Sequence, residues 1–150
     1  MDNRTRQQRF VVIVGLCLGL AYFAAGGSRA AAHDAGKPWI VPPAARRTKN
    51  PVRASPEGLA AAAKLYNLKC APCHGATGNG DGHMAKFLNP KPANFADAMM
   101  MHEMTDGELY WEMSEGRSPM PAWKDQMTET ERWQMVNYLR MFAPHGMNHK

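Results

Sequence analysis

The sequence has few cysteines and no extended β pattern. Of its three cysteines, Cys17 lies in an apolar N-terminal stretch, so only one close pair is left in the rest of the chain. One pair of cysteines is too few for a framework of disulfides. No run with apolar residues at alternate positions is long enough for a sheet, and no internal repeat is visible. A small domain without disulfides needs another source of stability, such as a bound group with a large apolar surface.

An excess of basic residues is also absent where the folded domain is expected. The net charge is +5, yet residues 55–143 hold eight Lys and Arg against eleven Asp and Glu. The basic character therefore belongs to the extensions of the chain. No expected helix carries a basic face with interleaved aromatic residues, which excludes nucleic acid as a partner. The sequence also contains no Ser/His/Asp set and no paired carboxylates for catalysis.

What the sequence does contain is a C-x-x-C-H motif, from Cys70 through Cys73 to His74. Two cysteines at this spacing can each form a thioether to one vinyl group of a haem, and the histidine can then donate its imidazole to the iron. The same C-x-x-C spacing also fits a redox dithiol or half of a zinc site. A dithiol would need a βαβ context and zinc a second Cys/His pair, so we expect one covalent haem c.

The first 32 residues have the layout of a secretory signal peptide. Arginines in residues 1–9 precede a continuous apolar run over residues 10–25, and three alanines ending at Ala32 offer a cleavage site. The run is shorter than the about 20 residues that usually span a bilayer, so we expect cleavage. Retention of residues 1–32 as a membrane anchor is the alternative. Either way, we expect export to the periplasm or to the periplasmic face of the inner membrane.

Residues 33–54 form a Pro-rich, basic linker or arm. Its four prolines remove backbone donors and fix φ, so we expect no regular element there. The simplest interpretation is a solvated spacer. The alternatives are that Trp39, Ile40 and Val41 dock the segment onto the domain or a partner, or that its basic cluster meets anionic lipid headgroups. Residues 144–150 are expected to be a disordered tail.

Helix signals define a domain at residues 55–143. Ser55, followed by proline and glutamate, predicts a helix start. Capping boxes beginning at Thr105 and Thr128 predict two further helices, and Gly116 is expected to end the first of these. The expected helices cover residues 56–69, 106–115 and 129–142, with a short helical turn at 84–88.

The sixth iron ligand is expected to be Met120. Its flanking prolines, Pro119 and Pro121, stiffen a loop between two capped helices, and this stiffness suits the presentation of a thioether sulfur. His83, in a Gly-rich loop that we expect to be flexible, and His102 are the rivals. The methionine run at residues 99–104 is interpreted as lining of the haem pocket.

Taken together, residues 56–142 resemble the class I monohaem cytochromes c of bacteria. The resemblance implies an all-α fold in which the first and last helices cross near the haem, with Ala62 at the crossing. It also implies that a proline carbonyl orients the axial imidazole, either that of Pro90 or that of Pro92. The motifs that carry it are Leu65-Tyr66, Cys70–Gly75, Gly80–Gly82, Leu88–Pro90, Met120–Trp123, Trp133 and Tyr138–Arg140.

We therefore expect a single-electron carrier rather than an enzyme, with a haem iron bound by His74 and Met120, in a periplasmic or membrane-associated chain. Its partners would be an electron donor and an electron acceptor protein. One alternative is a tightly bound cytochrome subunit of a larger respiratory or dehydrogenase complex. The other is a five-coordinate, ligand-binding or peroxidase-like cytochrome, which would require Met120 to be off the iron.

Overall fold

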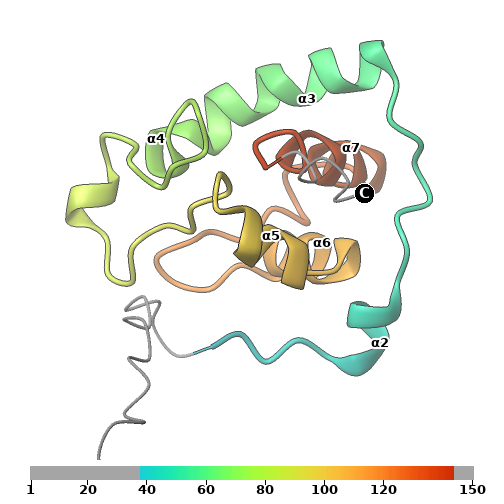
Figure 1. Cartoon of the computed structure of the whole chain (residues 1–150), viewed down its shortest axis with the longest axis horizontal. Helices are drawn as coiled ribbons and strands as arrows, with labels where there is room; N and C mark the ends of the chain where they lie inside the picture. Colours follow the sequence, from blue (N-terminus) through green and yellow to red (C-terminus); the bar gives the residue numbers. More distant parts are fainter. Residues whose placement is uncertain (1–37, 144–150) are drawn as a thin grey trace, which may run out of the picture. The chain divides into compact units, whose positions relative to one another are not determined.

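The computed structural model describes residues 38–143, which all belong to one unit of the chain, residues 34–150. The expected signal or anchor segment at 1–32 and the tail at 144–150 lie outside the described residues. The described elements are α2 (Pro43–Arg47), α3 (Pro56–Lys69), α4 (Ala71–His74), the 3₁₀ helix η1 (Ala85–Phe87), α5 (Ala98–Glu103), α6 (Asp106–Glu115) and α7 (Glu129–Leu139) (Figure 1). Residues 38–143 contain no strand, and the all-α fold class is confirmed.

The helix starts predicted from the sequence are confirmed. The Ser55 side chain accepts a hydrogen bond from Gly58 N at the start of α3. Both capping boxes are present, at Thr105 for α6 and at Thr128 for α7. Helix α7 ends at Leu139, three residues earlier than expected, because the next turn is closed by shorter i→i−3 bonds such as Met141 N to Tyr138 O.

Helices α3 and α7 pack directly against each other, as expected (Figure 1). Ala62 is buried on α3, and a Cβ added to Gly58 would lie 3.1 Å from the Gln134 side chain of α7, which shows how closely the two helices approach. One turn further on, the buried Tyr66 ring packs at 5.4 Å from Tyr138 and 4.9 Å from Phe142. Tyr66 belongs to the apolar core cluster, and Tyr138 and Phe142 pack against that cluster.

Helices α5 and α6 lie on the other side of α7 from α3 (Figure 1). The methionine run forms α5, an element that the sequence analysis did not predict, and its start is capped by Asp97, which accepts from two backbone N–H groups. Arg140, which directly follows α7, donates to Met104 O at 2.7 Å and forms an ion pair with Asp106. Arg140 thereby joins the end of α5 to the start of α6.

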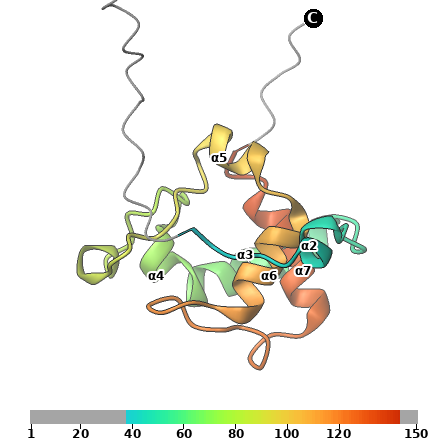
Figure 2. The same cartoon turned by 90° about the horizontal axis from the view of Figure 1, so that it is seen from below.

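Residues 33–37 of the arm lie outside the described residues. The described part, residues 38–54, contains the regular element α2, so the prediction that none forms in the arm is wrong. Proline at the first position of α2 has no N–H to leave unpaired and already has a helical φ. In two views the arm runs beside α6 before it turns towards the start of α3 (Figures 1 and 2). Trp39 contacts the domain as the docking alternative expected, whereas Ile40 is 80% exposed.

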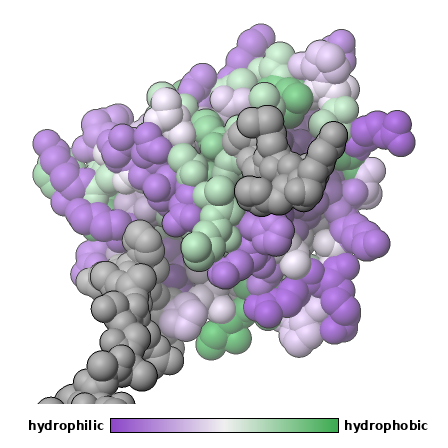
Figure 3. Space-filling view, viewed as in Figure 1, coloured by the Kyte–Doolittle hydropathy of each residue, from purple (hydrophilic) through white to green (hydrophobic). Residues whose placement is uncertain are grey.

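The apolar core gathers side chains from α3, α5, α6 and α7. On the face seen in Figure 3, hydrophilic residues surround the apolar ones, which form small patches. No helix within residues 38–143 is both long and apolar enough to cross a membrane. The largest fully buried side chains are Tyr66, Met101, Met135 and Val136.

Candidate functional site

The C-x-x-C-H motif lies where α3 passes into α4. Cys70 ends α3 and begins α4, and its carbonyl accepts hydrogen bonds from the backbone N–H groups of Cys73 at 3.0 Å and His74 at 2.8 Å. The two cysteines form no disulfide. A single helical turn therefore presents two thiols and one imidazole together, and this donor set fits a haem attached by two thioethers.

The orientation of the His74 ring is fixed by the carbonyl of Ala93, at 3.1 Å from Nδ1. A carbonyl oxygen can only accept, so Nδ1 carries the hydrogen and Nε2 keeps its lone pair for a metal. The partner expected from the resemblance was a carbonyl of Pro90 or Pro92. In the structure the carbonyl that orients the ring belongs to Ala93, the residue after Pro92.

The His74 ring is buried and stacks on Phe95, with ring centroids 4.5 Å apart and planes 17° apart. Burial lowers the pKa of His74 below its usual 6.5, and the hydrogen bond to Ala93 partly opposes this effect. The ring is therefore neutral at neutral pH. A neutral, oriented imidazole is the form that binds iron.

The Gly-rich segment after His74 is not the freely flexible loop that was expected. Its backbone N–H groups donate to carbonyls of the motif: Gly80 to His74, Gly82 to Cys73 and Met84 to Pro72, at 2.8–3.1 Å. These bonds satisfy carbonyls at the end of α4 that have no partner within the helix. A Cβ on Gly82 would lie 2.3 Å from Pro72 O, so only glycine allows this approach.

The two alternatives to haem attachment, a redox dithiol and a zinc site, receive little support from the surroundings of Cys70 and Cys73. Burial and the neighbouring Cys73 raise the pKa of Cys70 to about 12, and Lys69 opposes this only weakly. A reactive redox dithiol needs a lowered pKa instead. Within residues 38–143, no three His, Cys, Asp or Glu side chains lie together as ligands for a metal ion, and a zinc site would need such a group.

Met120 ends a tight turn, the Met120 turn (residues 117–120), that follows α6. Arg117 and Met120 exchange two backbone hydrogen bonds, of 2.9 and 2.7 Å, and form an isolated β-bridge. Beyond the turn, the chain is bonded back to α6 by Trp123 N to Met113 O at 3.1 Å. Met120 and Cys70 both pack against the same apolar core cluster.

The two rival ligands, both histidines, lie outside the Met120 turn. His83 is exposed in the Gly-rich loop, and His102 is exposed on α5. In the methionine run, Met101 is 2% exposed and belongs to the core, whereas Met99 is 74% exposed. The interpretation of the run as lining of the haem pocket stays a prediction.

Sequence reasoning missed two residues beside His74 and one ion pair of the arm. Ala93 acts through its backbone carbonyl, which no side-chain pattern reveals. Phe95 gave a weak signal, as a lone aromatic residue in a polar segment. Glu108 was recognised as part of a capping box, but its second carboxylate oxygen also pairs with Arg46 of the arm at 2.9 Å.

Known proteins resemble this chain over the part that contains the site. The family model for cytochrome c matches residues 59–142, more than half of the chain. A chain of the Kuenenia stuttgartiensis reducing HAO-like protein complex Kustc0457/Kustc0458 is 25% identical over 62% of this chain, with a TM-score of 0.54. The match spans 47% of that chain, about half of its length.

A second solved structure, the KustC0563 c-type cytochrome, is 29% identical over 55% of this chain and 96% of its own, with a TM-score of 0.49. No curated protein matches. The family match covers both the C-x-x-C-H turn and the Met120 turn. The chain thus belongs to the cytochrome c family, whose members carry covalently bound haem c and transfer electrons through its iron.

Proposed function

We propose that this protein is an exported single-electron carrier whose haem c is attached through Cys70 and Cys73 and whose iron is bound by His74 and Met120. The bound haem iron supplies the redox chemistry by alternating between Fe(III) and Fe(II). The observation that carries the proposal is the orientation of His74, whose Nδ1 donates to Ala93 O and leaves Nε2 for the iron.

The residues around His74 and Met120 are held in place in a way that suits an electron carrier. Ala93 and Phe95 restrict the His74 ring on two sides, so the imidazole needs little rearrangement when the iron changes oxidation state. The Met120 turn is closed by two backbone bonds and bonded to α6, so it can present sulfur with a small loss of entropy. Soft thioether sulfur stabilises Fe(II) relative to a second nitrogen ligand and so raises the potential.

Optical spectroscopy of ferric protein tests the ligand assignment. A thioether on Fe(III) gives a weak band near the red end of the spectrum, which Met120→Ala should abolish, and the iron of the variant should then bind added imidazole readily. Met101→Leu and Met104→Leu are matched controls and should keep the band. If one of the controls abolishes the band while Met120→Ala keeps it, the ligand lies in α5 instead. If no methionine substitution changes the spectrum, the five-coordinate alternative is favoured.

A tightly bound subunit of a larger oxidoreductase complex is the second candidate. The observation that favours it is the similarity to a chain of a reducing HAO-like protein complex. Native protein that elutes at the mass of one chain would support the freely diffusing carrier, whereas elution together with other polypeptides would support the subunit.

Export is proposed from residues 1–32 alone, and a mass spectrum of native protein tests it. A mature chain that starts at His33 with one added haem would indicate cleavage and release to the periplasm. The full-length mass in the membrane fraction would indicate retention as an anchor.

A further inference from the structure

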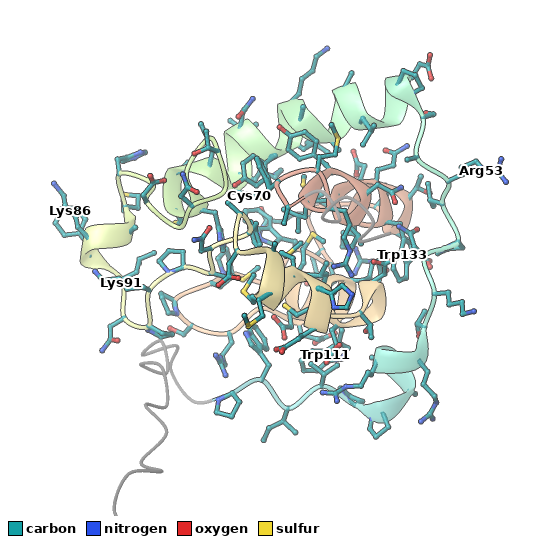
Figure 4. All side chains as sticks on the ribbon, viewed as in Figure 1. Arg53, Cys70, Lys86, Lys91, Trp111 and Trp133 are labelled. Carbon is teal, nitrogen blue, oxygen red and sulfur yellow. The ribbon has the colours of Figure 1, made fainter. Side chains whose placement is uncertain are left out.

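One aromatic residue of the arm contacts both α6 and the Met120 turn. The Trp39 ring packs edge-to-face against Trp111 of α6, with centroids 6.0 Å apart. The Arg117 guanidinium lies over the same Trp39 ring, 4.4 Å from its centroid. Figure 4 shows Trp111 on the side of α6 that faces the arm. Trp39 thus lies between a rigid helix and the first residue of the turn.

Arg117 transmits this contact directly to Met120. Its backbone N–H donates to Met120 O and its carbonyl accepts from Met120 N, so the two residues move together. Gly116, the residue before, has a φ of +63°, and a Cβ there would lie 2.4 Å from Ala122 N. Because the chain is tightly folded on both sides of Met120, a displacement of Arg117 also displaces Met120.

The arm itself is fixed near Trp39. A Cβ added to Gly107 of α6 would lie 1.9 Å from Ala45 O, so the arm backbone lies directly on the helix. Arg46 pairs with the largely buried Glu108 at 2.9 Å. Further along, Asn50 donates to Trp133 O and to the Asn137 side chain, at 3.1 and 2.9 Å. Trp39 is therefore carried by a well-anchored segment.

We propose that Trp39 is a positioning residue for the axial methionine: by packing between Trp111 and Arg117, it keeps the Met120 turn in the conformation that binds iron. This inference rests on the proposed ligation by His74 and Met120. It makes the arm a functional part of the haem site rather than a spacer. Cation–π and aromatic pair contacts of this kind are each favourable, so their loss should destabilise the turn.

Imidazole titration of the ferric, full-chain holoprotein tests the proposal. Imidazole reaches the iron only when Met120 is off it, so its apparent affinity reports the population of the open state. Trp39→Ala should bind imidazole about tenfold more tightly than the wild type, corresponding to about 1.4 kcal/mol, and its red band should weaken. Trp39→Phe, which keeps an aromatic face for Arg117, should recover most of the wild-type affinity.

Asn50→Ala is the matched control, because it removes two contacts between the arm and α7 without touching the Met120 turn. It should lower the melting temperature yet leave imidazole affinity within about twofold of the wild type. If Trp39→Ala does not yield folded holoprotein, Trp39→Leu replaces it, since leucine keeps apolar bulk but offers no ring face.

Two results would overturn the proposal: unchanged imidazole affinity in the folded Trp39 variant, or an equal rise in affinity in Asn50→Ala. The second result would mean that general loosening of the arm, and not support of the turn, opens the iron. Failure of the ligand assignment is recognised separately, because the red band would then persist in Met120→Ala.

Discussion

The two sides of the proposed haem site are built in different ways. On the histidine side, residues 70–95 supply the thiols, the imidazole, its Ala93 partner and its Phe95 neighbour from one continuous stretch of chain. On the methionine side, Arg117 of the Met120 turn contacts Trp39, which lies 78 positions earlier in the sequence. The histidine side is thus a local structure, whereas the methionine side is assembled by tertiary contacts.

This difference suggests a division of roles. Backbone hydrogen bonds anchor the histidine side, and they vary little with side-chain substitution elsewhere. Backbone hydrogen bonds also close the Met120 turn, but its contact with the arm is made by partly exposed side chains. We therefore expect substitutions on the histidine side to affect haem attachment and folding, and substitutions on the methionine side to affect ligand exchange and potential. The predictions below test this comparison.

The largest effect is expected from removal of both thioethers on the histidine side. Cys70→Ser together with Cys73→Ser should abolish covalent haem, and most of the domain should unfold, because a chain this small relies on the haem for apolar surface. Haem staining after denaturing electrophoresis and far-UV circular dichroism measure the two effects. Stain that persists on the variant would contradict the assignment of the motif.

A smaller effect is expected from a single methyl group where the Gly-rich loop meets α4. Gly82→Ala places Cβ at 2.3 Å from Pro72 O, so either the loop or α4 must move. We expect a loss of about 2–3 kcal/mol in the free energy of unfolding, measured by denaturant titration. Ala76→Ser, at an exposed position of the same loop, is the control and should stay near the wild-type value.

On the methionine side, Glu112 should make stability depend on pH. Burial raises its pKa from 4.5 to about 7, the nearby Glu108 adds to this, and Arg117 opposes it. Between pH 4.5 and 7 the folded chain retains a proton that the unfolded chain has lost, so stability falls as the pH rises through this range. Above about pH 7 the loss of stability caused by Glu112 has reached its full size.

Glu112→Gln imitates the protonated form and should remove this dependence. At pH 8 the variant should be more stable than the wild type by on the order of 2 kcal/mol, and at pH 4 the two should agree. Thermal unfolding across this pH range measures the difference. A stability difference that is the same at both ends of the range would show that Glu112 does not titrate as proposed.

The smallest effect is expected from one buried hydroxyl on the histidine side. Tyr66 donates to Gly75 O at 2.7 Å, directly after the C-x-x-C-H motif. Tyr66→Phe should lower the free energy of unfolding by about 1 kcal/mol, since the ring packing remains and one buried carbonyl loses its donor. The red band should be unchanged. A weakened band would mean that the two sides of the site are more strongly coupled than the contacts indicate.

The sequence alone determined the features that depend on near neighbours. The C-x-x-C-H turn needs only five consecutive residues, and the capping boxes at Thr105 and Thr128 need only the first turn of each helix. Such signals lie within one or two helical turns, so they can be interpreted before any packing is known. The all-α fold followed from the family resemblance, which itself rests on these local motifs.

Only the tertiary structure decided which groups surround the proposed ligands. The partner of His74 is the backbone carbonyl of Ala93, and every residue type carries a carbonyl, so the sequence could not distinguish it from those of Pro90 and Pro92. The arm was expected to be a spacer because proline blocks regular structure. It packs on α6 because Gly107 leaves room for its backbone and Trp39 finds an aromatic neighbour there, and neither contact is visible until the chain is folded.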